Sequence, residues 1–359
     1  MPFCDVSRDP TEIPLFQHRQ TSAPLPSFAR DPAKDLEPPA DWIDPSACVA
    51  AELALVEQTL VRSIRSVEPA LTEIASHLIC GGGKRVRPMV TLLAYKAFGG
   101  AKTQDIVDIA TAIELIHTAT LLHDDIIDGA ETRRGKESAY KKFGLKNTLV
   151  AGDFLFIKAF EFAGKFDDTI VQWTADACTQ LTEGEVLQGS FNRNAAVTVA
   201  DYIEIVRRKT ASLFETGAKI GAYLAGGSSA LVETARDYGL NLGIAFQIVD
   251  DILDVVGHKE LLGKPTGIDL RDGNPSLPII LALKGREKAV AEAFQSGHPT
   301  DEKIREALEA MGRGAAIQQA KKLSRTYAEQ TLAAAVQLPP SVYSNGLRSL
   351  IELIIDRDF

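Results

Sequence analysis

Two long apolar stretches of the chain each end in three aspartates, and this pairing constrains the fold most strongly. In the first, residues 103–129, isoleucine and leucine recur at helical spacing, and no glycine or proline interrupts the run before Gly129. The second, residues 229–257, has equally little polar content along its length. Such helices belong at the centre of a bundle. The six aspartates are Asp124, Asp125 and Asp128, and Asp250, Asp251 and Asp254.

Carboxylates one helical turn apart repel each other unless a cation lies between them. In a helix the Cβ atoms of Asp124 and Asp128 are about 5–6 Å apart. Magnesium often takes one or two carboxylates together with the phosphates of a substrate. Arg133 and Arg134 follow at once and suit phosphate. One such cluster alone is most simply a solvated helix end, but the recurrence among isoleucine, leucine and valine favours a metal site for a diphosphate with an apolar tail.

A second basic feature is the sequence Gly-Gly-Gly-Lys-Arg-Val-Arg-Pro at residues 81–88. Glycines let the backbone approach a ligand closely, and Lys84 and Arg87 add two cations three residues apart. Backbone amides and cations together make an anion site. Taken alone, the segment is better explained as an interhelix loop with incidental charges. It lacks the order of a nucleotide P-loop.

The remaining sequence indicates an all-α protein, because no segment shows sustained alternation of apolar and polar residues. Residues 1–45 are rich in proline and are predicted to be extended or disordered. A single helical domain is predicted for residues 46–359, beginning near Asp44-Pro45. A helical pattern covers residues 47–78, and further helices are predicted at 89–98, 103–129, 147–164, 168–191, 199–224, 229–257, 276–296, 300–311, 313–337 and 344–356.

Composition excludes several classes of protein. The net charge of −9 and the absence of a lysine–arginine block argue against a general nucleic-acid binder. No uninterrupted apolar segment is long enough to span a bilayer, and the N-terminus lacks the pattern of a secretory signal, so we do not expect an integral membrane protein. The four cysteines are scattered without metal-ligand spacing, which favours the reducing cytoplasm.

With both aspartate motifs, the glycine–basic loop and Arg133-Arg134-Gly135 in this order, residues 46–359 resemble the trans-isoprenyl diphosphate synthase family. The resemblance implies a single-domain bundle of about ten or more helices around a central apolar cavity. It also implies a magnesium-dependent prenyltransferase that condenses isopentenyl diphosphate with an allylic diphosphate to an all-trans polyprenyl diphosphate. Three Mg²⁺ ions between the aspartate clusters and a homodimer are the further expectations.

The resemblance assigns roles to individual residues. Asp124, Asp128 and Asp250 are the expected direct metal ligands, and Asp125, Asp251 and Asp254 are expected to act behind them or through water. The expected isopentenyl diphosphate site is Lys84, Arg87, His117 and Arg134. The expected allylic diphosphate site is Arg133, Lys209, Thr210, Gln247 and Lys264, of which Lys209, Thr210 and Gln247 lie beside the carbocation as catalytic groups. Glu185 and Gln188 match a supporting motif.

Two of these assignments have plain alternatives. His117 could be an ordinary core histidine, although it precedes Asp124 by two helical turns and so shares its face. Lys209 could be an exposed helix lysine after two arginines. One position departs from the family pattern: many relatives carry a second lysine where this chain has Asn274, so Lys264 would have to serve alone.

Product length is predicted from the residues just before the first aspartate motif. In the family, the residue five positions before the first aspartate often limits elongation; here it is Ala119, followed by Thr120, and neither is aromatic. We therefore expect a long-chain product, with Phe156 and Phe160 as a candidate floor of the cavity or as plain core packing. A farnesyl or geranylgeranyl product, and one subunit of a heteromeric synthase, remain alternatives; a terpene cyclase or a purely structural bundle fits the motifs less well.

Overall fold

The computed structural model describes residues 42–257 and 266–355, and within these ranges the fold is all-α apart from one short hairpin. The N-terminal half contains α1 Pro45–Cys48, α2 Ala50–Ser63, α3 Pro69–Ile79, α4 Val86–Ala97, α5 Thr103–Ile127, the strands β1 Thr132–Arg133 and β2 Lys136–Glu137, α6 Ala139–Phe143 and α7 Leu145–Ala163. The two strands pair antiparallel.

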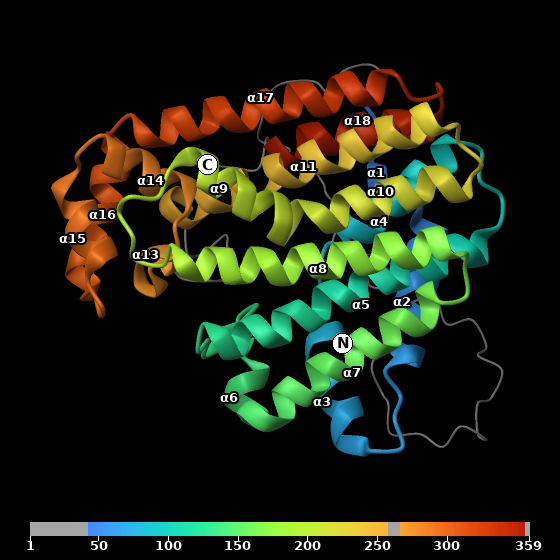
Figure 1. The fold of residues 1–359 in the computed structure, drawn as a ribbon, viewed down its shortest axis with the longest axis horizontal. Helices are drawn as coiled ribbons and strands as arrows, with labels where there is room; N and C mark the ends of the chain where they lie inside the picture. The colour runs from blue at the N-terminus through green and yellow to red at the C-terminus, as the bar shows by residue number, and fades with distance from the viewer. Residues whose placement is uncertain (1–41, 258–265, 356–359) are drawn as a thin grey trace.

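In the described ranges the C-terminal half contains helices and connecting loops but no strand. It contains α8 Asp168–Ser190, α9 Val199–Val206, the π-helix η1 Arg207–Ala211, α10 Ser212–Leu224, α11 Ser229–Val256, α13 Ile268–Asp272, α14 Leu277–Lys284, α15 Lys288–Gln295, α16 Asp301–Arg313, α17 Ala316–Val336 and α18 Val342–Ile355. The long helices run along the molecule's long axis, and α13–α16 gather at one end (Figure 1).

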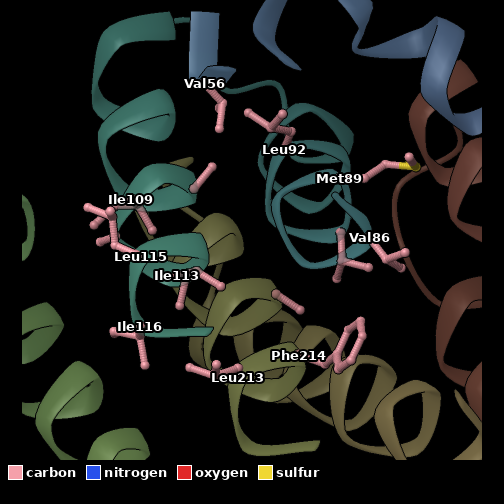
Figure 2. Packing of buried hydrophobic residues seen from close by; sticks show 14 of the residues in the cluster. Val56, Val86, Met89, Leu92, Ile109, Ile113, Leu115, Ile116, Leu213 and Phe214 are labelled. Carbon is pink, nitrogen blue, oxygen red and sulfur yellow. The ribbon is translucent and has the colours of Figure 1, made fainter. Parts of the chain in front are cut away.

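Helix α5 is the core helix of the bundle. All residues from Ile106 to Ile116 are buried, including the polar Asp108 and Glu114. Figure 2 shows Ile113 and Ile116 of α5 on the side toward Leu213 of α10, and Leu92 belongs to the same core cluster. Among the described helices, α5 alone is long and apolar enough to cross a membrane, and 78% of its most apolar window is buried within the protein. Its apolar length is therefore used for internal packing.

Two stretches predicted as single helices are each interrupted. Residues 47–78 form α2 and α3 with a break before Pro69, because the residue preceding a proline is driven out of the helical region; Glu68 has φ −92° and ψ 104°. The predicted helix 276–296 divides into α14 and α15, because the chain turns at Gly285-Arg286, where Arg286 has φ 63°. The hairpin and the short helices α6 and α13 were not predicted from the sequence.

Candidate active site

The first aspartate motif lies at the end of α5, close to a lysine from another part of the chain. Helix α5 ends at Ile127, with Asp128 as its C-cap. The Nζ of Lys209 lies 3.8 Å from Oδ1 of Asp124. Burial, only partly offset by Lys209, raises the pKa of Asp124, and burial together with the nearby charge of Asp124 raises the pKa of Asp128 to about 6. Both shifts mark a site where negative charge lacks a full counter-charge.

Asp125 is paired with an arginine rather than with Lys209. Its side chain is completely buried, and its Oδ1 accepts from Nε and Nη2 of Arg133, on β1, at 2.7 and 2.6 Å. The other carboxylate oxygen, Oδ2, is buried without a hydrogen-bond partner in the protein. The middle aspartate of the first motif therefore fixes Arg133 and the hairpin at the end of α5.

Lys209 and Thr210 lie in η1, the π-helical turn between α9 and α10. Single π-turns inside helices occur frequently at functional sites. Lys209 forms an ion pair with Glu185 of α8 as well as approaching Asp124. Although burial disfavours its charge, Asp124 and Glu185 raise the pKa of Lys209. Lys209 is thus a partly buried lysine between two helices, and the alternative of an exposed lysine is wrong.

The second motif is joined to η1 through hydrogen bonds. The hydroxyl of Thr210 donates to Oε1 of Gln247 at 2.9 Å, and Nε2 of Gln247 donates to Oδ1 of Asp251 at 2.8 Å. Asp251 is 5% exposed, and burial raises its pKa to about 7. Because η1 contacts Asp124 on one side and Gln247 on the other, the two aspartate motifs belong to one site.

The other two aspartates of the second motif differ in environment. Asp254 accepts from the backbone amides of Ile268 and Asp269, each at 3.2 Å, and so holds the start of α13. Asp250 is half-buried. Burial lowers the pKa of Arg87 to about 10, and the negative charges of Glu114 and Asp250 partly oppose this shift. Asp250 thus lies within electrostatic reach of the basic loop.

The basic residues of two distant segments meet around His117. Nη1 of Arg134 donates to the carbonyl of Gly82, and the Cζ of Arg87 lies 4.7 Å from the ring centroid of Phe214. The Nε of Arg87 is buried without a hydrogen-bond partner. Burial and the surrounding arginines lower the pKa of His117 well below its usual value, so its imidazole is neutral. Lys84 is exposed at the edge of this cluster.

Sequence reasoning missed the group that anchors this cluster. Arg85 is 5% exposed, has φ 48°, and donates to Glu57 of α2, to Glu114 of α5 at 2.7 Å and to the carbonyl of Ile79 at 2.8 Å. Although burial disfavours the charge of Arg85, Glu114 and Glu57 hold its pKa above the usual value. A signal was present, since Glu114 stands in an otherwise apolar run three residues before His117.

The remaining predicted residues are placed as follows. Ala119 is completely buried, Thr120 donates to the carbonyl of His117 at 2.8 Å, and Phe156 is half-buried with its ring centroid 5.8 Å from that of His123. Phe160 lies on the outer side of α7 and is 38% exposed. Lys264 falls outside the described residues. The roles of these side chains in chain length and diphosphate binding stay predictions.

Asn274, at the position where many relatives have lysine, is held in place by neutral contacts. Its Oδ1 accepts from Nε2 of Gln188 at 3.1 Å, and its backbone amide donates to the carbonyl of Asp269 at 2.9 Å. Gln188, near the end of α8, therefore supports the segment that follows α13.

The model of the family "Polyprenyl synthetase" matches residues 68–311 of the chain. This chain belongs to the polyprenyl synthetase family. An octaprenyl diphosphate synthase of Haemophilus influenzae is 35% identical over 313 residues, covering 86% of this chain and 94% of that protein. A short chain isoprenyl diphosphate synthase of Methanothermobacter thermautotrophicus is 34% identical over 312 residues, covering 85% and 96%.

Solved structures agree with this membership. The crystal structure of a polyprenyl synthase from Caulobacter crescentus, complexed with calcium and isoprenyl diphosphate, matches with a TM-score of 0.83 and 36% identity, covering 88% of this chain and 97% of that one. Membership and fold together make this polyprenyl synthetase a trans-prenyltransferase with an all-α fold, as the sequence motifs predicted.

The carboxylates of this polyprenyl synthetase fit magnesium of the kind that is shared with a substrate. Within residues 42–257 and 266–355, no three acidic, histidine or cysteine side chains converge as a ready-made metal site. Magnesium is usually held by one or two carboxylates and completed by phosphate and water, so no such cage is required. Burial is the main cause of the raised pKa values of Asp124 and Asp128, and a bound dication would offset its effect on their charged forms.

Proposed function

We propose that this enzyme condenses isopentenyl diphosphate with an allylic diphosphate, releasing diphosphate and forming an all-trans polyprenyl diphosphate of long chain length. The observation that carries the proposal is the continuous set of contacts from Asp124 through Lys209 and Thr210 to Gln247 and Asp251. These contacts support one site that both aspartate motifs share, and the arginines around His117 support a second anion site.

The allylic diphosphate would bind between the two motifs. Magnesium, when bound, would neutralise the leaving diphosphate, and Asp124, Asp128 and Asp250 are the carboxylates we expect to hold it; three ions per site remain the expectation from the family resemblance. Arg133 is held by Asp125, and Lys209 by Asp124 and Glu185, so both cations are fixed before substrate arrives. Protein charges that already face the place where negative charge develops on the leaving diphosphate usually make the largest single contribution to catalysis.

Isopentenyl diphosphate would bind at the basic cluster. Arg87 has a buried Nε without a partner in the protein, which is the state expected of a group that awaits an anion. Arg134 and Lys84 add charge, and His117 adds a neutral ring with hydrogen-bonding nitrogens. The double bond of this substrate attacks the allylic carbon as its C–O bond breaks, and one proton is then lost. Gln247 and Thr210 present oxygen atoms, suited to the positive charge at that carbon.

The test is an assay of the purified chain with labelled isopentenyl diphosphate, Mg²⁺ and several allylic primers, in which released diphosphate is measured and products are sized. The isolated chain should release diphosphate only with both substrates and magnesium, and Asp124→Asn should abolish the release. Activity that appears only after a second protein is added would favour the heteromeric alternative, and products of farnesyl or geranylgeranyl size would favour the short-chain one.

The partner we propose is a second copy of the chain. On the outer side of α7, large apolar residues are 38–60% exposed: Leu145, Leu149, Val150, Ile157 and Phe160. At 100° per residue these positions share one side of the helix, and a contiguous exposed apolar strip of this kind is a mark of an association surface. The homodimer and a cytoplasmic location otherwise rest on the sequence expectations given above.

A further inference from the structure

Tyr202, in α9, is a buried tyrosine in contact with the site, and no motif in the sequence pointed to it. Its side chain is 2% exposed, and its hydroxyl donates to Oδ2 of Asp251 at 2.7 Å. It lies seven residues before Lys209 on the segment that leads into η1. A buried tyrosine hydroxyl needs a partner, but a backbone carbonyl would satisfy that need as well as a catalytic-motif aspartate does.

The carboxylate of Asp251 accepts hydrogen bonds from three protein donors. Besides Tyr202, it accepts from Nε2 of Gln247 at 2.8 Å and from the backbone amide of Leu277 at 3.2 Å. Asp251 is only 5% exposed and has three protein donors, whereas within the described residues Asp124 and Asp128 do not have such a set of donors. The middle aspartate of the second motif thus faces protein, as Asp125 of the first motif faces Arg133.

The carboxylate fixes which way the amide of Gln247 points. A carboxylate accepts hydrogen bonds only, so the NH₂ of Gln247 must face Asp251. The amide oxygen then faces the opposite way, where it accepts from the hydroxyl of Thr210 at 2.9 Å. Thr210 adjoins Lys209, whose ammonium is 3.8 Å from Asp124. The contacts therefore run without a gap from Tyr202 to the place where the allylic diphosphate is held.

We infer that Tyr202 is a positioning residue for the reaction: through Asp251 it fixes the amide of Gln247 so that the oxygens of Gln247 and Thr210 face the carbon that becomes positive. The inference rests on the proposed function and adds to it a residue that touches neither substrate nor metal. Without the tyrosine hydroxyl, Asp251 keeps two donors but can rotate, and the orientation of the amide oxygen is no longer fixed.

The test uses Tyr202→Phe, which removes one hydroxyl, and Tyr238→Phe as the matched control. Tyr238 is 1% exposed, lies on α11 as Asp251 and Gln247 do, and donates to the carbonyl of Leu347 at 2.9 Å, outside the site. Each variant loses one buried hydrogen bond, so both should lower Tm by a similar amount. Only Tyr202→Phe should lower kcat, by about tenfold, which corresponds to about 1.4 kcal/mol in the barrier.

Two further readouts separate positioning from general damage. KM for both diphosphates and the half-saturating Mg²⁺ concentration should stay within about twofold of wild type, because no binding group is removed. In a Gln247→Ala background, Tyr202→Phe should have little further effect on kcat, since groups acting through one another are non-additive.

A kcat for Tyr202→Phe equal to that of Tyr238→Phe would overturn the inference, as would a loss confined to KM, a shifted Mg²⁺ requirement or losses that multiply in the double variant. The wild-type and Tyr238→Phe rates report on the proposed function separately. Their absence would refute that function, whereas their presence with an unaffected Tyr202→Phe refutes only the role of Tyr202.

Discussion

At the scale of single residues, the middle aspartate of each motif contacts protein groups. The middle residues Asp125 and Asp251 hold protein groups, whereas Asp124 and Asp128 lie beside Lys209 with excess negative charge. Burial is the main reason why Asp124, Asp128 and Asp251 all carry raised pKa values. It also means that the site is built at some cost in stability, as is common where function needs uncompensated charge.

The cost should appear as a pH dependence of the metal-free protein. Burial raises the pKa of Asp128 from 3.8 to about 6 and that of Asp251 to about 7. A raised pKa in the folded state favours the protonated form, so the stabilisation is complete below the unfolded value and is lost as the pH rises through the folded one. In EDTA, the contribution of these two carboxyl groups to stability should therefore fall between about pH 4 and about pH 7 and then level off, whereas the lowered pKa of His117 adds a slope of opposite sign below its unfolded value.

Asp128→Asn should remove the part of that decline that ends near pH 6, since the variant cannot titrate there. Mg²⁺ with diphosphate should restore Tm above pH 7 in wild type and less in the variant, because ligands that bind only the folded state stabilise it. A Tm difference between wild type and Asp128→Asn that stays constant from pH 4 to pH 7 in EDTA would contradict the prediction.

Glu114 offers a second test at this scale, because it anchors Arg85 beneath the basic loop. Glu114→Gln should destabilise the protein by about 1–3 kcal/mol, since a buried charged hydrogen bond is weakened. KM for isopentenyl diphosphate should rise more than KM for the allylic substrate, as the loop carries Lys84 and Arg87.

The control is Glu309→Gln, which breaks the exposed pair with Arg313 and should change stability by less than about 0.5 kcal/mol. Equal changes in both KM values for Glu114→Gln would show that the anchor does not serve one substrate site in particular.

Ala119 tests the predicted product length. It is completely buried on α5, five residues before Asp124, so Ala119→Phe should block elongation and shift the products to shorter chains. Overpacking can cost about 1–3 kcal/mol, so Tm is measured alongside the sized products. If the folded variant gives the same products as wild type, Ala119 does not control chain length.

At the scale of elements, the site depends on how closely two helices approach η1. A Cβ added at Gly184 of α8 would lie 2.7 Å from the backbone nitrogen of Lys209, and one at Gly243 of α11 would lie 2.6 Å from the Cα of Ala211. Glycine at these two positions lets α8 and α11 pack directly on the π-turn. The backbone of Lys209 and Thr210 is therefore fixed from both sides.

Gly184→Ala should displace η1, lowering kcat at least about tenfold and stability by about 1–3 kcal/mol. Gly189→Ala is the matched control on the same helix, because a Cβ there meets nothing within 4 Å. It should be neutral or stabilising by up to about 1 kcal/mol, as alanine favours the helix over glycine. Similar kinetics for the two variants would show that the close approach at Gly184 is dispensable.

At the scale of the whole molecule, α5 and α11 both end toward the side where α13–α16 gather (Figure 1). The active end is thus separate from the outer side of α7, which we propose as the dimer surface. Ile157 is 60% exposed there, and Ile157→Glu should shift the chain from dimer to monomer in light scattering. Val67→Glu, at a 96% exposed position in the loop between α2 and α3, is the control. A wild-type monomer, or a dimer unaffected by Ile157→Glu, would reject this surface.

The sequence by itself predicted which residues belong to the proposed active site. Helical periodicity ending in aspartates predicted α5 and α11, and the basic segments at 81–88 and 133–135 predicted the anion sites, because such signals depend only on residues near one another in the chain. Tertiary structure alone decided which groups support them. Arg85 with Glu57 and Glu114, and Tyr202 with Asp251, join residues 28–49 positions apart, and burial gives these polar groups partners that no local pattern can show.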